Sequence, residues 1–183
     1  MDDANLETVI VQATADALTP ALRAKRDTFY AATFRGGNDP ARYWEPPQVH
    51  YFLMHGEQLI GHVGVYRREI AHAGQRYAVA GIAKVGLIPT ERGDGLGSRL
   101  MQYVQDDLRA QATDDLGLLV TGENRLGFYG RLGWQRVAGP VIYDYTGTPR
   151  IETSPVLLLG LRLTAAAHTA WQEEPIDLAG PFW

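Results

Sequence analysis

The chain has 183 residues, of which 45% are hydrophobic and 21% are charged, and its formal net charge is -4. This composition is ordinary for a globular protein, and the mildly acidic balance argues against nonspecific binding of nucleic acid. The absence of cysteine excludes disulfides, thiolate nucleophiles and cysteine metal ligands.

The sequence contains no segment typical of export or membrane insertion. Met1 to Asn5 includes no basic stretch followed by an apolar run, and nowhere do the roughly 18 consecutive apolar residues of a membrane span occur. We therefore expect a single domain over residues 1–183, located in the cytoplasm and not in a membrane.

The first half of the chain predicts a strand, a helix and then several strands. Residues 7–13 alternate as in a strand, and Thr19 and Pro20 suit the N-cap and first position of a helix that runs to about Phe34. A loop is expected over residues 35–40. Three strands follow, at residues 49–54, 59–70 and 76–87.

The second half predicts alternating helices and strands. A helix is expected from Ser98 to about Arg109, and a short one over residues 125–132. Further strands are expected at residues 116–120, 134–137, 142–145 and 156–163, the last two closing the sheet. The order predicts an α/β (α+β) fold, with helices packed on a mixed sheet.

The stretch before the second long helix is the most informative part of the sequence. A turn and Arg92 follow an apolar strand, and Gly93, Gly95 and Gly97 then alternate up to Ser98. Glycines leave backbone N–H groups accessible, and the first turn of a helix has unpaired N–H groups and positive potential. The pattern predicts a pyrophosphate cradle, with a glycine-rich turn that merely opens a helix as the alternative.

Three types of phosphate-binding loop could explain these glycines. A P-loop needs a Gly-Lys pair, which is absent, and a dinucleotide fingerprint needs glycine where Ser98 stands. The remaining pattern, Arg-x-x-Gly-x-Gly after a strand, is met by Arg92, Gly95 and Gly97. It resembles the acyl-CoA loop of the GCN5-related N-acetyltransferase (GNAT) superfamily.

This resemblance implies a fold and a set of binding residues. The fold is a central mixed, mostly antiparallel sheet flanked by helices and splayed between its fourth and fifth strands. Acetyl-CoA would be the acyl donor, with no metal. The implied CoA-binding residues are Val85, Gly86, Leu87, Arg92, Gly93, Asp94, Gly95, Leu96, Gly97 and Ser98.

Gly86 lies inside a predicted strand, where glycine usually weakens packing. It marks a bulge or the close approach of another backbone, and a tolerated glycine is the alternative. A bulge there would turn the strand away from residues 116–120, so that a pantetheine arm could pair with the free edge.

A second motif follows the glycine loop in the order that the superfamily requires. Phe-Tyr-x-Arg-x-Gly-Trp, from Phe128 to Trp134, resembles the second signature of the same superfamily. The resemblance implies that Tyr129 protonates the departing CoA thiolate, because a phenol is a suitable proton donor to a thiolate, and that Asn124 contacts pantetheine. A packed core aromatic is the alternative role for Tyr129.

The expected reaction is direct transfer to an amine without a covalent enzyme intermediate. Candidates for the base that deprotonates or orients the amine are Glu123, Asp144, Glu152, the histidines and the carboxylate of Trp183. The five histidines have no spacing that groups them as metal ligands, and each is interpreted as structural.

Two subfamilies are similar in more detail. Residues 61–70, followed by Gly74, resemble the third-strand region of aminoglycoside 2'-N-acetyltransferases and of nodulation N-acyltransferases, and the ending at Trp183 resembles the former. Two departures matter, because Ala83 and Pro181 stand where the aminoglycoside enzymes have acidic residues. Asp39, Glu152 or Trp183 would then have to contact the substrate.

The sequence therefore predicts an acetyl-CoA-dependent N-acetyltransferase that acts on a small amine, with an aminoglycoside or amino-sugar as one expected acceptor. The alternatives are an N-acyltransferase for another amine or a longer acyl chain, and a CoA-binding sensor without catalysis. A homodimer is one expected assembly, since dimers are common in the superfamily that the chain resembles.

Overall fold

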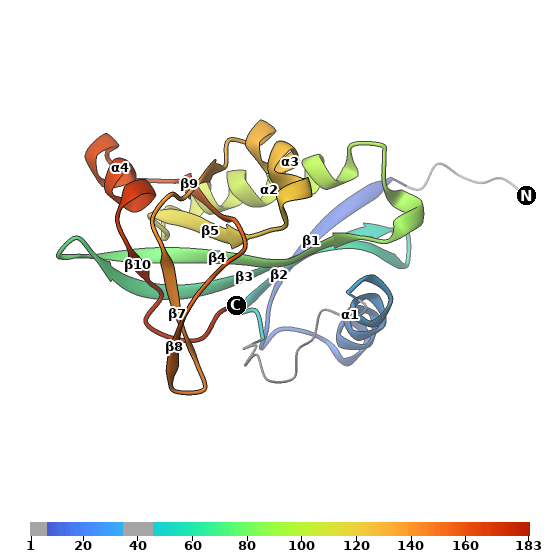
Figure 1. The fold of residues 1–183 in the computed structure, drawn as a ribbon. Helices are drawn as coiled ribbons and strands as arrows, with labels where there is room; N and C mark the ends of the chain where they lie inside the picture. The colour runs from blue at the N-terminus through green and yellow to red at the C-terminus, as the bar shows by residue number, and fades with distance from the viewer. Residues whose placement is uncertain (1–6, 35–45) are drawn as a thin grey trace, which may run out of the picture.

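The protein folds around a seven-stranded sheet accompanied by a separate three-stranded sheet, with strand orders β1-β2-β3-β4-β5-β9-β6 and β10-β7-β8 (Figure 1). The computed structural model describes residues 7–34 and 46–183. The strands of the large sheet are β1 (Thr8–Thr14), β2 (Val49–His55), β3 (Gln58–His72), β4 (Gln75–Leu87), β5 (Leu116–Val120), β9 (Val156–Gly160) and β6 (Gln135–Arg136). Those of the small sheet are β7 (Val141–Tyr145), β8 (Thr148–Ile151) and β10 (Ile176–Asp177).

Four α-helices and two 3-10 turns connect the strands within the described residues. The helices are α1 (Pro20–Thr33), α2 (Leu96–Gln111), α3 (Leu126–Arg131) and α4 (Ala165–Glu173), and the 3-10 turns are η1 (Pro89–Glu91) and η2 (Glu123–Arg125). None of these helices is long and apolar enough to cross a membrane.

The large sheet is mixed and mostly antiparallel, as the sequence predicted. Strands β1 to β4 pair antiparallel in chain order, β4 and β5 pair in parallel, and β5, β9 and β6 are again antiparallel. Helix α1 lies on the opposite side of the sheet from α2 and α3 (Figure 1). The α/β class and the helices flanking the sheet are thus confirmed.

The prediction that residues 142–145 close the large sheet is wrong. The place beside β9 is taken by β6, and β7 instead pairs with β8 and β10. A tight turn joins β7 directly to β8. In this turn Gly147, with a φ of 81°, donates its N–H to the Asp144 carboxylate at 2.7 Å. The sequence analysis missed β8, α4 and the two-residue β10, although Thr164 caps α4 by accepting from the Ala167 N–H at 3.2 Å.

Alternation along the strands divides the core between the two faces of the sheet. On one face, Tyr51, Val63 and Ile82 pack under α2 and α3. On the other, Phe52 packs against Phe29 of α1. A separate apolar cluster joins the central strands to α4 and the C-terminal segment.

Strand β4 leaves β5 part of the way along its length, as expected from the resemblance. The two strands pair from Val79 opposite Leu116 to Ile82 opposite Leu119 and no further. Opposite β3, the partner of His62 is Gly86 and the partner of Gly64 is Ala83, so β4 bulges between these pairs. Lys84 has a left-handed φ of 52° there.

The bulge is therefore not centred on Gly86, where the sequence analysis placed it. Gly86 instead allows a close approach, by side chains and not by backbone, because a β-carbon there would lie 2.9 Å from the Thr33 methyl and 3.0 Å from the Phe34 ring. Glycine at this position lets the end of α1 approach the strand closely.

A buried pair of histidines ties the bulge to the neighbouring strands. His62 Nδ1 lies 2.9 Å from the Lys84 carbonyl oxygen, so it donates, and Nε2 must then accept from His50 Nδ1 at 3.0 Å. Burial lowers the pKa of His50 to about 4 and that of His62 to about 3, so both rings are neutral at pH 7.

We expect this pair to make the fold acid-sensitive well above the range where carboxylates titrate. In the unfolded chain each histidine takes up a proton below its ordinary pKa of 6.5, whereas in the fold it resists until about pH 4 or lower. The free energy of unfolding should therefore decrease as the pH is lowered, by about 2 kcal/mol per histidine between pH 7 and pH 5. Urea unfolding across that range measures the loss.

The variant His50→Leu removes one of the two titrating groups and isolates their contribution. It should be less stable than the wild type at pH 7, because His62 loses its donor, but its stability should fall less steeply toward pH 5. An unchanged slope would mean that other groups cause the acid sensitivity.

Candidate functional site

Two adjoining cavities open where β4 separates from β5, and Tyr129 lines both of them. We call them the loop cavity, of about 610 Å³, and the splay cavity, of about 340 Å³. The loop cavity is lined by Thr33, Phe34, Val85, Gly86, Leu87, Arg92, Gly93, Gly95, Gly97, Ser98, Leu100, Arg125, Phe128, Tyr129 and Arg131. The splay cavity is lined by Phe34, Ile82, Ala83, Lys84, Val85, Leu119, Val120, Thr121, Gly122, Arg125, Tyr129, Phe182 and Trp183.

The glycine loop forms one wall of the loop cavity and leaves its backbone open. Gly93 and Gly95 have φ angles of 114° and 77°, which side chains disfavour, and a β-carbon on either would meet nothing within 4 Å. Gly95 is the N-cap of the sixteen-residue helix α2, so the N–H groups of its first turn face this opening without intrahelical partners. The wall is suited to bind an anion.

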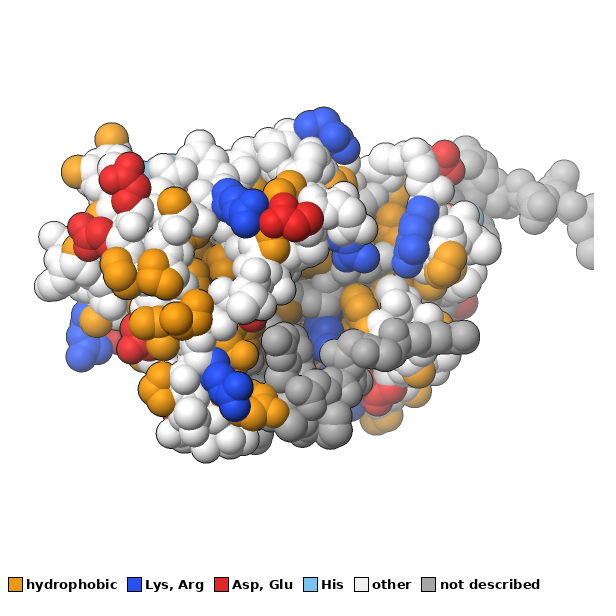
Figure 2. Space-filling view, viewed as in Figure 1, with side chains coloured by type: hydrophobic (Ala, Val, Ile, Leu, Met, Phe, Trp, Pro, Cys, Tyr) orange, Lys and Arg blue, Asp and Glu red, His pale blue; other side chains and the backbone are white. Residues whose placement is uncertain are grey.

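Arg92 holds the loop in shape while lining the cavity. Its guanidinium donates through Nε and Nη2 to the Leu87 carbonyl oxygen at 3.2 and 3.1 Å, which joins the end of β4 to the loop. Figure 2 shows that Lys and Arg side chains gather around α3 and the loop that follows β4. Arg125 and Arg131 add further positive charge to the cavity wall.

Most of the residues predicted to bind the donor lie together. Of the predicted set, Asp94 and Leu96 do not line either cavity: Asp94 is exposed, and Leu96 packs against the core. Asn124 is exposed and lies outside both cavity walls, whereas the next residue, Arg125, lines both. Sequence reasoning missed Arg125 because no motif singled it out, although it is one helical turn before Tyr129.

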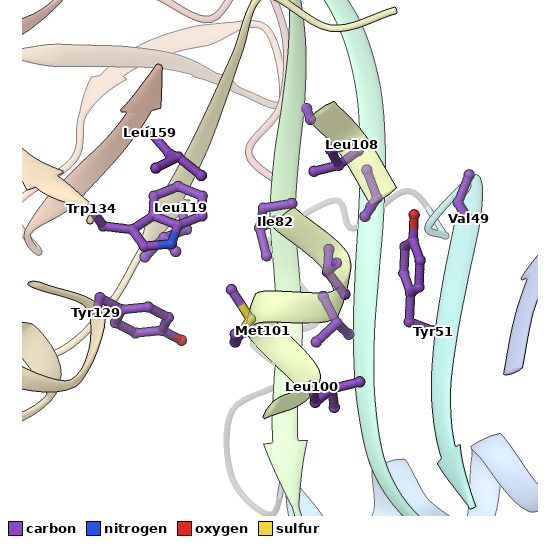
Figure 3. Packing of buried hydrophobic residues seen from close by; sticks show 14 of the residues in the cluster. Val49, Tyr51, Ile82, Leu100, Met101, Leu108, Leu119, Tyr129, Trp134 and Leu159 are labelled. Carbon is purple, nitrogen blue, oxygen red and sulfur yellow. The ribbon is translucent and has the colours of Figure 1, made fainter. Parts of the chain in front are cut away.

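Tyr129 lies at the boundary between the cavities. Its ring packs edge-on against Phe128 and Trp134, and the side chain is 3% exposed. Figure 3 shows it reaching from α3 with its hydroxyl toward Met101 and β4. Burial raises the pKa of Tyr129 to about 12, an effect that the nearby positive charge of Arg125 opposes. The phenol is therefore protonated at neutral pH and can donate a proton.

The free edge of β4 continues from one cavity to the other. Val85 lines both, Ala83 lines the splay cavity and Leu87 lines the loop cavity, all beyond the last pair with β5. An extended ligand could therefore use backbone groups of this edge, as an additional strand does.

The C-terminal residues form the far wall of the splay cavity. Trp183 is 4% exposed, and a β-carbon on Gly81 would overlap its indole ring. Arg68 holds the segment by donating to the carbonyls of Leu178 at 3.0 Å and Pro181 at 2.9 Å, with its guanidinium 5.6 Å from the Trp183 ring. The C-terminal segment therefore packs onto the domain.

The carboxylates proposed for the substrate are not found on these walls. Glu152 lines neither cavity, and its carboxylate accepts from the Ser154 N–H at 2.8 Å. Asp39 lies outside the described residues. Ala83, at the position of the expected glutamate, presents a methyl group to the splay cavity, and no described residue that lines this cavity is acidic.

One comparison with known proteins shows the family of the chain. A family model described as an acetyltransferase (GNAT) domain matches residues 13–137. A search of curated proteins found no significant sequence match. Among solved structures, the GNAT family N-acetyltransferase YhbS from Escherichia coli, in complex with CoA, has 17% identity and a TM-score of 0.65, covering 97% of this chain and 93% of that one.

Two further structures show the same fold. Escherichia coli ElaA has 14% identity and a TM-score of 0.63, covering 83% of this chain and 99% of that chain. A GNAT family acetyltransferase from Brucella melitensis, in complex with acetyl-CoA, has 17% identity and a TM-score of 0.55, covering 85% of this chain and 88% of that one.

A substitution at Gly81 tests whether Trp183 packs against this residue and so forms a wall of the splay cavity. Gly81→Ala should displace the indole and destabilise the protein by about 1–3 kcal/mol, as overpacking does. Denaturant unfolding measures the loss, and tryptophan fluorescence should report a more exposed ring. In a Trp183→Ala background the same substitution should cost much less, so equal costs in both backgrounds would contradict the contact.

Proposed function

Because the chain belongs to the acetyltransferase (GNAT) domain family, we propose that it is an acetyl-CoA-dependent N-acetyltransferase that acetylates a small amine directly. The observation that supports this most is the position of Tyr129, whose buried phenol lines both the loop cavity and the splay cavity. The donor would occupy the first cavity and the acceptor the second. Two proteins of similar fold are described in complex with CoA or acetyl-CoA.

The loop cavity suits the donor from its phosphates to its thioester. The pyrophosphate would accept from the N–H groups at the start of α2, beside Gly95 and Gly97. The pantetheine amides would pair with the free edge of β4 near Val85, which directs the thioester toward Tyr129.

The reaction then needs one proton delivered and one removed. The amine nitrogen attacks the thioester carbonyl carbon, the carbon–sulfur bond breaks, and the Tyr129 hydroxyl gives its proton to the departing sulfur. Since no acidic side chain is among the described residues that line the splay cavity, the amine would enter as the neutral base and lose its second proton to water. Tyr129 is reprotonated from solvent.

The acceptor class expected from the subfamily resemblance, an aminoglycoside or amino-sugar, stays a prediction. Trp183 lines the splay cavity, which supports its expected contact with the substrate. Transfer of a longer acyl chain and non-catalytic binding of CoA are the alternatives, and turnover with any amine would exclude the second.

We expect Gly97→Ala to weaken acetyl-CoA binding about tenfold or more without weakening the fold. Its β-carbon would meet Leu87 and Phe128 only at ordinary contact distances of 3.6 and 3.8 Å, so the added methyl occupies cavity space instead of core. Alanine is also a better helix former than glycine. Isothermal titration measures the affinity, and thermal unfolding should show an equal or higher Tm.

Gly130→Ala provides the matched control for that substitution. Gly130 lies in α3, is exposed, lines neither cavity and has open space around its β-carbon position. Its acetyl-CoA affinity should equal that of the wild type. If Gly97→Ala binds acetyl-CoA as the wild type does, the proposed pyrophosphate position is wrong.

We expect Tyr129→Phe to lower kcat by roughly 10²- to 10⁴-fold while acetyl-CoA binding is retained, because only the proton donor is lost. Release of free thiol measures turnover. Tyr103→Phe is the control, since Tyr103 is exposed on α2 and lines neither cavity. Normal turnover by Tyr129→Phe would remove this phenol from the chemistry.

A further inference from the structure

The wall of the splay cavity combines positive charge with aromatic surface. Its described lining contains the cationic side chains of Lys84 and Arg125 and no acidic side chain. Phe34, Phe182 and Trp183 contribute rings, and its volume of about 340 Å³ is at the lower end of the range for small-molecule sites. Among the described side chains of this wall, Arg125 would attract an anionic group.

Arg125 is the cation placed to act at the acceptor's reacting end. It ends η2 immediately before α3, one helical turn before Tyr129, and both residues line both cavities. Its guanidinium is exposed, and within residues 7–34 and 46–183 it has no hydrogen-bond or ion-pair partner. The nearby carboxylate of Glu123 pairs with Arg136 at 3.1 Å instead.

Arg125 differs from the other cationic residues of the loop cavity in reaching the splay cavity as well. The anion-binding start of α2 lies in the loop cavity, where Arg92 and Arg131 also contribute charge, and none of these groups lines the splay cavity. Arg125 instead lies beside the phenol that would protonate the leaving sulfur. An anion on Arg125 is therefore close to the transferred acetyl group, as in a compact amine that bears its own acid.

We propose that the acceptor is an amine that also bears a carboxylate and an apolar or aromatic body, as an amino acid does, with the carboxylate held by Arg125. This inference rests on the proposed acetyltransferase function. The planar guanidinium suits a bidentate pair with a carboxylate. The apolar body lies against Phe182 and Trp183, and the amine is directed toward the thioester beside Tyr129.

The test compares two acetylated products that differ only in the carboxylate, N-acetyltryptophan and N-acetyltryptamine. Each is titrated calorimetrically into the protein saturated with CoA. We expect N-acetyltryptophan to bind at least about tenfold more tightly, because a charge-assisted pair with Arg125 is lost with the carboxylate. Equal binding, tighter binding of N-acetyltryptamine, or no binding of either would overturn the proposal.

Two variants assign the preference to one arginine. Arg125→Gln should reduce the difference between the two products to about twofold or less by weakening only N-acetyltryptophan, and Arg125→Lys should restore part of it. Arg109→Gln is the matched control, because Arg109 is an exposed arginine of α2 that lines neither cavity. It should keep the full preference once CoA is saturating. A preference that survives Arg125→Gln would contradict the assignment.

A turnover measurement separates this inference from the function on which it rests. Free-thiol release is followed with acetyl-CoA and tryptophan, tryptamine or an aminoglycoside. The proposal requires that kcat/KM be highest for tryptophan. If tryptamine or the aminoglycoside is turned over as fast as tryptophan or faster, the acceptor class is wrong and the acetyltransferase function stands. A carboxylate-dependent binding preference without thiol release from any of the three amines would support a carboxylate site at Arg125 and overturn its role in binding the acceptor.

Discussion

The separation of β4 from β5 after Ile82 is the feature on which the rest of the site depends. Two parallel strands that paired throughout would fill their own backbone edges and leave no opening between them. Here a bulge at Lys84 redirects β4, and the buried His62 holds the carbonyl of the same residue at 2.9 Å. Both cavities, and the free edge that joins them, exist because this pairing stops.

Tyr129 lies at this opening and is the proposed proton donor of the reaction. The phenol is nearly buried, so desolvation keeps it protonated, while Arg125 provides a positive charge that would favour the phenolate formed when the proton leaves. The same arginine faces the splay cavity, where the wall is cationic and aromatic. One helical turn thus links the proposed proton donor to the proposed recognition of the acceptor.

Local sequence signals predicted elements well where turn and cap chemistry is strong. Thr19 caps α1 by accepting from the Leu22 N–H, and the glycine loop opens α2, as predicted. Prediction failed where an element depends on a distant partner. Strand β10 consists of Ile176 and Asp177 and is defined only by its pairing with β7. The bulge was expected at Gly86 and lies at Lys84 instead, because lysine is not a residue type that marks a left-handed φ.

By itself, the sequence determined the fold class, the glycine loop that opens α2 and the candidate proton donor, because each depends on residues close together in the chain. Only the tertiary structure decided what surrounds them. It placed Arg125 on both cavity walls in preference to Asn124, brought Trp183 onto Gly81, and left Glu152 off both walls. These relations join residues far apart in sequence, and they arise from the packing of strands and segments, which no local pattern encodes.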